Sequence, residues 1–211
     1  MALIALVACC DTKYHELCFA KQNILESGNQ VLVIDIATGP DIRFKADITR
    51  ETVLEIGGHT WEQVRNMAKS DAISAMTESI SATMDKLYAE KKMDGVLSMG
   101  GLQNTVVCSA AFCRLPYGFP KMICSTIASG YRYFDTVVGD KDIAVMPSIV
   151  DFAGMNPINE VTLSNAIGAL IGMVQYGGHL IDMRGEKYWL TAVLRRSVFI
   201  PQASADVLWK D

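Results

Sequence analysis

Short, nearly continuous apolar runs alternate along the chain with longer segments in which apolar residues recur every three or four positions. Residues 2–8 form the first run, whose length and lack of polar positions are typical of a parallel strand covered on both faces. Residues 14–27 follow with helical spacing and end before Gly28 and Asn29, which suits a helix C-terminus. Residues 30–36 supply a second strand. The pattern predicts a β-α-β unit with parallel strands and a right-handed crossover.

The same alternation continues to about residue 177. Residues 38–60 are the least regular stretch, with one short helix expected near 50–56. Residues 70–91 carry an apolar stripe that predicts a long amphipathic helix. Further strands are expected at 94–99, 121–124 and within 143–150, with one helix ending at residue 113 and another spanning 159–174. The alternation predicts one α/β domain over residues 1–178, with a doubly wound, mainly parallel, Rossmann-like sheet in three α/β/α layers.

The composition narrows the class of protein. Half of the 211 residues are apolar and a fifth are charged, and the formal net charge is −4. This charge provides no basic field for nucleic acid or an anionic membrane, so any phosphate site must be local. The six cysteines include no CxxC pair and the three histidines are scattered. We therefore expect no metal site and a reducing, cytoplasmic setting.

Two apolar stretches invite comparison with membrane or targeting segments. The first ten residues lack a basic lead and are soon followed by Asp11 and Lys13. Residues 158–176 are interrupted by Asn159 and Glu160. We expect a buried strand and a core helix at these positions, and no membrane partner.

Polar residues follow the first two predicted strands, at the sheet edge where doubly wound folds bind ligands. Asp11, Thr12 and Lys13 come directly before a helix, and a lysine with a hydroxyl at a helix N-terminus suits an anion. The simpler interpretation is that Asp11 or Thr12 caps this helix. Asp35 ends the second strand, where dinucleotide folds place an acceptor for ribose hydroxyls. No GxGxxG follows the first strand, which disfavours a standard NAD site.

Two later strand ends carry glycine, amide and hydroxyl residues that suit contact with a ligand. The candidates are Gly100, Gly101, Asn104 and Thr105 after the third strand, and Ser125, Thr126, Ser129 and Gly130 after the fourth. Tight turns and solvated hydroxyls are the structural alternatives. No GxSxG surrounds Ser125, so a nucleophilic role has little support. Two such loops on successive strands favour ligand contact, and Asp151 after the last strand is a further candidate.

The order of these motifs resembles that of one family. The motifs are residues 11–13, 100–101, 125–130, 139–143 and 148–151, followed by Gly154 and Asn156. Over residues 2–177 the chain resembles the ATP-binding domain at the N-terminus of the tomato mosaic virus resistance protein and its uncharacterised bacterial and fungal relatives. The resemblance implies a Rossmann-like fold, binding of ATP with or without magnesium, and self-association into a homo-oligomer. It implies no particular reaction and no catalytic residue.

The chain departs from this family in two places. The glycine loop is GGLQNT where the family commonly has GGSGGT, so Leu102 and Gln103 add bulk at the expected phosphate approach. Residues 179–211 form a divergent, partly apolar tail that needs a partner surface.

Three functions stay open at this point. A nucleotide-binding domain that acts in an oligomer, with ATP preferred, is favoured. A small-molecule enzyme would use the Ser125–Thr126 loop with Asp11 or Asp151. A degenerate interaction module would have lost its ligand through the change in the glycine loop.

Overall fold

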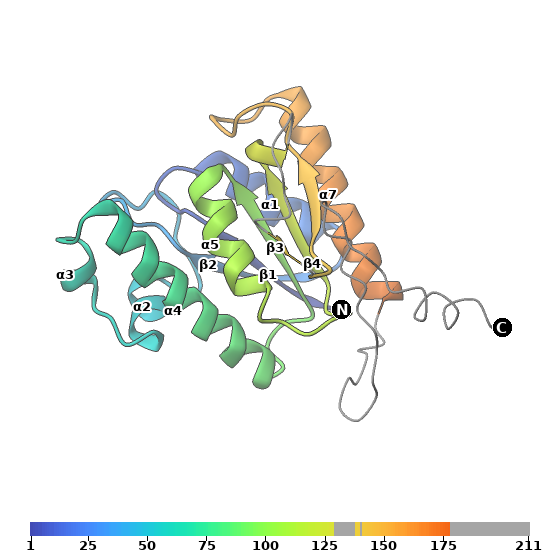
Figure 1. Ribbon diagram of the computed structural model, residues 1–211. Coiled ribbons are helices and arrows are strands. Elements are labelled where there is room, and N and C mark those ends of the chain that lie inside the picture. Colours follow the sequence, from blue (N-terminus) through green and yellow to red (C-terminus); the bar gives the residue numbers. More distant parts are fainter. Residues whose placement is uncertain (129–137, 140, 178–211) are drawn as a thin grey trace, which may run out of the picture. The chain divides into compact units, whose positions relative to one another are not determined.

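Five parallel strands form one central sheet with helices on both faces (Figure 1). The computed structural model describes residues 1–128, 138–139 and 141–177, and the predicted tail at 179–211 lies outside them. The strands are β1 (Leu3–Ala8), β2 (Gln30–Asp35), β3 (Gly95–Gly100), β4 (Lys121–Ser125) and β5 (Ala144–Pro147). The helices are α1 (Tyr14–Glu26), α2 (Arg50–Ile56), α3 (Trp61–Val64), α4 (Lys69–Ala89), α5 (Leu102–Phe112) and α7 (Pro157–Tyr176), with a 3₁₀ turn, η1, at Thr126–Ala128.

The strand order is β2-β1-β3-β4-β5, and every neighbouring pair is parallel. The chain passes from β1 outward to β2 and then returns to the other side of β1 to form β3. The order therefore reverses between β1 and β3. In open α/β sheets, a ligand binds outside the carboxyl ends of the strands at such a switch point.

Alternate residues of β1 supply the two apolar layers. Ile4 and Leu6 belong to the core beneath α1 and α7, whereas Ala5 and Val7 belong to the core beneath α2, α4 and α5. Helix α4 packs against both α2 and α5, and α1 packs against α7. Because successive side chains of a strand point to opposite faces, a strand buried on both faces needs this continuous apolar run. The prediction of a doubly wound, three-layer fold is confirmed.

The element boundaries agree closely with the sequence pattern, with two differences. Residues 143–150 contain the single short strand β5. Helix α3 was not predicted, because four residues are too few to show a helical period. It begins at a capping box in which Thr60 and Gln63 satisfy each other's backbone N–H groups. Among the described residues, no helix is both long and apolar enough to cross a membrane.

Candidate functional site

A cavity of about 550 Å³ opens at the carboxyl edge of the sheet, beside the switch point between β1 and β3. Its lining comes from the segment after β1 (residues 9–13), the segment after β2 (38–39), the start of α5 (101–104) and the segment that leads from α3 into α4 (64–72). Asp11, Thr12, Lys13, Gly101 and Asn104, all predicted from the sequence, are brought together here. The topology explains why these residues lie together, since the parallel strands that precede them end at the same edge of the sheet.

Three helices begin at this cavity without a side-chain cap. Lys13 and Gly101 are the N-cap residues of α1 and α5, and both line the cavity. Helix α4 has Ala68 as its N-cap, and its first residue, Lys69, lines the cavity. The capping role considered for Asp11 and Thr12 is therefore wrong. The other described helices with an N-cap are capped by side chains, namely those of Thr49, Thr60 and Asn156.

Uncapped N-termini leave backbone N–H groups without partners and place the positive ends of the helix dipoles at the cavity. Lys13, Arg65 and Lys69 add three cationic side chains to the same lining. The Lys13 ammonium donates to the carbonyl of Phe152, which ties the start of α1 to the loop after β5. Among the described residues that line the cavity, Asp11 is the one acidic residue. The cavity is therefore locally electropositive on a chain whose net charge is negative.

The Asp11 carboxylate is held in an unusual setting. Its Oδ1 atom is buried and has no hydrogen-bond partner among the described residues. Buried polar oxygens nearly always accept a hydrogen bond, so this atom marks a position for an external donor. On its other side the carboxylate lies so close to Gly39 that a Cβ at position 39 would collide with Oδ2. A larger residue at position 39 would therefore require the Asp11 side chain to shift.

Asn104 and Gln103 fix the start of α5 at the cavity. The Asn104 Nδ2 group donates to the Ser98 hydroxyl on β3, and the Asn104 side chain lies where a Cβ on Gly100 would be. The Gln103 Nε2 group donates to the Thr38 hydroxyl at 3.2 Å. Leu102 is 56% exposed and lies at the cavity rim. The larger side chains of Leu102 and Gln103 in the GGLQNT loop therefore do not cover Gly101, whose backbone still lines the cavity.

Asp35 is placed outside the cavity, between the ends of β1 and β2. Its carboxylate is buried and accepts hydrogen bonds from the backbone N–H groups of Cys10 at 3.0 Å and Ala37 at 2.8 Å. Burial raises the pKa of Asp35, and the two backbone hydrogen bonds and the charge of Arg50 oppose that rise. This geometry favours a structural role, in which Asp35 joins two strand ends.

Ser125 and Thr105 lie behind the cavity wall. Both side chains are fully buried, and their hydroxyls are 2.7 Å apart. The Ser125 hydroxyl also accepts from the Ile127 N–H at 3.2 Å. Thr126 lies in η1, facing Gly101. The placement of Ser125 favours a role in joining β4 to α5 over contact with a ligand.

The remaining predicted residues fall elsewhere. Asp151 is exposed in the loop after β5, and its backbone carbonyl accepts from the side chain of Asn159. Ser129 and Gly130 lie outside the described residues. In the described part of the chain, no three His, Cys, Asp or Glu side chains cluster in a way that would hold a metal ion.

The thiols near the cavity are unsuited to nucleophilic chemistry. Cys9 lines the cavity, and burial, followed by the negative charge of Asp11, holds the pKa of its thiol far above the ordinary value. Burial also raises the pKa of Cys108 to about 12. Both thiols therefore stay protonated at neutral pH. Cys10, Cys108 and Cys124 are fully buried in the core, where a reduced cysteine packs as a small hydrophobic side chain.

Sequence reasoning missed two walls of the cavity. Thr38 and Gly39 lie in the irregular segment after β2, and Arg65, Met67 and Lys69 lie around a helix too short to be seen in the pattern. No local motif marks these residues. Only the topology, which folds residues 61–72 back to the carboxyl edge, could have identified them.

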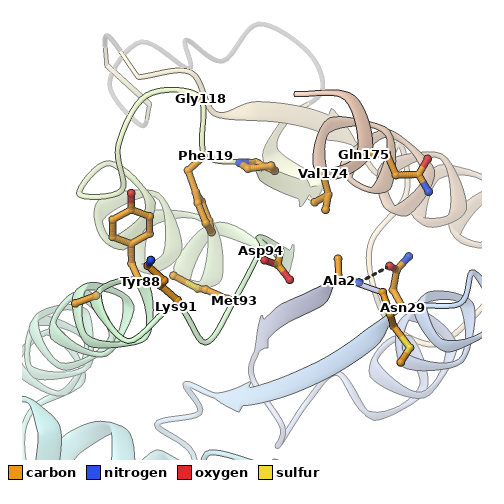
Figure 2. Close-up of a pocket in the computed structure, with 13 residues that line it drawn as sticks. Ala2, Asn29, Tyr88, Lys91, Met93, Asp94, Gly118, Phe119, Val174 and Gln175 are labelled. Atoms are coloured by element: carbon orange, nitrogen blue, oxygen red, sulfur yellow. Dashed lines mark hydrogen bonds between the residues drawn. The ribbon is translucent and has the colours of Figure 1, made fainter. Parts of the chain in front are cut away.

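A second cavity, of about 720 Å³, lies at the opposite edge of the sheet (Figure 2). Its walls include Met93, Phe119 and Val174. Two polar groups near it hold the start of β1, because Asn29 Oδ1 accepts from the Ala2 N–H and Asp94 Oδ2 accepts from the Leu3 N–H. None of the described residues that line this second cavity lies at a helix N-terminus.

Comparison with known proteins identifies one family and several proteins to which this chain is similar. Residues 2–179 match the model of an N-terminal domain, that of an uncharacterised protein family, UPF0261. The chain is 34% identical over 194 residues to a UPF0261 protein of Clostridium tetani, covering 90% of this chain and 46% of that protein. It is 32% identical over 184 residues to the ToMV resistance protein Tm-1 of Solanum lycopersicum, covering 78% of this chain and 24% of that protein. A UPF0261 protein of Rhizobium meliloti is 34% identical over 177 residues, which is 82% of this chain and 42% of that protein. The chain thus spans less than half the length of each of these relatives.

Proposed function

The chain belongs to the uncharacterised family UPF0261, whose N-terminal domain it matches, and from this premise we propose that it binds a nucleotide, ATP preferred, as part of a homo-oligomer. The site is the cavity at the carboxyl edge between β1 and β3. The proposal assigns binding and no reaction.

One observation carries the proposal: three uncapped helix N-termini and three cationic side chains meet at one cavity. Helix N-termini bind phosphate because their free N–H groups donate and their dipoles favour negative charge. The volume of about 550 Å³ lies within the usual range for a small-molecule site. The apolar side chains of Met67 and Leu102 at the rim suit the faces of a base.

Asp11 supplies the carboxylate that a nucleotide site also uses. Its buried, unpartnered oxygen suits a ribose hydroxyl. It is also the one carboxylate of the lining that would hold a magnesium ion carried in by the phosphates, which supply the remaining oxygen ligands of such an ion.

The two competing functions receive less support. An enzyme that uses Ser125 would need its hydroxyl at the surface, but that side chain is fully buried and hydrogen-bonded to Thr105. A degenerate module would need a filled site. The exposed Leu102 leaves the cavity open instead.

Calorimetric titration with ATP, ADP and NAD tests the proposal, with Lys13→Ala as the site variant. Loss of one charge beside a phosphate should weaken ATP binding about tenfold, which is about 1.4 kcal/mol. The variant also loses the hydrogen bond to Phe152, so stability should fall by about 1 kcal/mol.

Lys86→Ala is the matched control, because Lys86 lies in the last turn of α4, far along that helix from the cavity. It should bind ATP like the parent chain. Unchanged ATP affinity in Lys13→Ala would remove Lys13 from the site, and no binding of any nucleotide by the parent chain would refute the proposal.

A further inference from the structure

The segment that leads from α3 into α4 is a firmly anchored wall of the cavity. Val64 is buried, and the Trp61 ring lies 3.5 Å from the Arg50 guanidinium. Arg50 is itself buried and donates to the carbonyls of Gly39 and Pro40, in the loop after β2. Two walls of the cavity are therefore fixed to one another through a single arginine.

This wall presents two exposed cations, Arg65 and Lys69. Neither forms an ion pair with a described residue, whereas Lys13 donates to the Phe152 carbonyl. The acidic neighbour Asp71 accepts from Ser70 at 3.2 Å. Positive charge on this wall is thus left for something that enters the cavity.

The helix N-termini of α1 and α5 and the 65–69 wall line different parts of one cavity. A single phosphate does not fill it, because about 550 Å³ is the volume of many water molecules at about 30 Å³ each. A chain of two or three phosphates spreads its charge over a longer stretch than one phosphate does, so it suits a lining whose N–H groups and cations lie on different segments. Arginine suits the end of such a chain, since its planar fork donates two parallel hydrogen bonds to one phosphate.

We propose that Arg65 and Lys69 bind the terminal phosphate, so that the cavity selects nucleoside diphosphates and triphosphates over monophosphates. This inference rests on the proposed nucleotide site and names two binding residues for it.

Calorimetry of the parent chain and of the double variant Arg65→Gln/Lys69→Gln, with AMP, ADP, ATP and inorganic tripolyphosphate, tests this assignment. The parent should bind ATP and ADP more tightly than AMP. In the double variant, ATP affinity should fall about 10- to 100-fold while AMP affinity changes less than about threefold. Both substituted side chains are exposed, so the melting temperature should stay near that of the parent.

Lys86→Gln/Lys91→Gln is the matched control, since it removes the same charge in the last turn of α4 (Lys86) and just after that helix ends (Lys91), and it should leave ATP binding unchanged. An equal loss of AMP and ATP affinity in the site variant, or an ATP loss in the control as large as in the site variant, overturns the inference. If the parent binds neither ATP nor tripolyphosphate, the inference and the proposed function are overturned together. Binding of tripolyphosphate without nucleotide supports the cationic wall and refutes the nucleotide function alone.

Discussion

Gly101 is the residue at which bare backbone forms the cavity wall. It has extended backbone angles, and a Cβ there would meet only the Thr126 hydroxyl, at 3.6 Å. Gly101→Val should therefore fold with a melting temperature close to that of the parent. The branched side chain should block the approach of a phosphate to the start of α5, so ATP affinity should fall at least about tenfold. Calorimetry and a melting curve check the two effects separately, and parental ATP affinity in this variant would make the loop purely structural.

The reverse change tests the departure from the family loop. Leu102→Ser with Gln103→Gly restores part of GGSGGT, clears the rim and frees backbone donors, so ATP should bind more tightly. Added glycine and loss of the hydrogen bond from Gln103 to Thr38 should lower stability by about 1–2 kcal/mol. Asn104 is kept, because its side chain holds Ser98 on β3. Weaker ATP binding would show that Leu102 or Gln103 contributes to the site.

At the scale of elements, an ion pair between a buried lysine and a partly exposed aspartate fixes the start of β4. Lys121 is fully buried, and its ammonium contacts Asp142 Oδ1 and the Pro116 carbonyl, each at 2.7 Å. Asp142 Oδ2 accepts from the Gly118 N–H at 2.7 Å. Burial alone would raise the pKa of Asp142, but the hydrogen bonds from Lys121 and Gly118 hold it below its ordinary value near 3.8. Burial lowers the pKa of Lys121.

Asp142→Asn should therefore destabilise the fold at neutral pH. It leaves a buried ammonium without its counter-charge, and the loss should be about 2–3 kcal/mol, because Asp142 itself is partly exposed. A carboxylate with a lowered folded-state pKa stabilises fully above its unfolded value and loses that effect as pH falls through the folded value. Urea denaturation at pH 7 and pH 3 should show a large gap between parent and variant that shrinks in acid. A constant gap would contradict the assignment.

The elements themselves were largely predictable, and the residues that complete the cavity were not. An apolar stripe with helical spacing marks α4 over 21 residues and a continuous apolar run marks β1 over six, so the local pattern alone identifies them. The four-residue α3 gives no period. Arg65 and Lys69 look like ordinary surface charges until the fold places them in the same cavity lining as Lys13. Asp35 shows the converse, since its position at a strand end suggested ribose binding while its carboxylate is hydrogen-bonded to two backbone N–H groups.

At the scale of the whole molecule, the outer side of α7 predicts self-association. Glu160 is the only charged residue among the 20 of this helix, and Val161 is 59% exposed while Ile158 and Tyr176 are also exposed. A helix with so little charge on its outer side is typical of one that packs against a partner. A second copy of the chain, related by a two-fold axis, is the simplest such partner.

Light scattering over a dilution series checks this expectation. The parent should exceed 23.1 kDa at micromolar concentration. Val161→Lys should shift the mass toward that of a monomer, because an unpaired charge is costly in an apolar interface. Asn165→Lys at the exposed middle of α7 tests the extent of the interface, and Lys86→Ala controls for nonspecific change. A mass near 23.1 kDa for the parent at every concentration would contradict self-association.

From the three uncapped helix starts at one cavity we also expect the stability of the protein without nucleotide to depend on its buffer. Sulfate or inorganic phosphate at millimolar concentration can accept hydrogen bonds from the backbone N–H groups that no side chain caps. Each bound anion adds RT ln(1 + [L]/Kd) to the free energy of unfolding, where [L] is the concentration of the anion and Kd its dissociation constant. Sulfate also stabilises proteins in general by exclusion from their surface, so the Gly101→Val variant supplies the baseline against which the specific part is seen. In phosphate buffer, inorganic phosphate would compete with ATP for these N–H groups in every titration. The measured affinity for ATP would then be too low by the factor 1 + [L]/Kd.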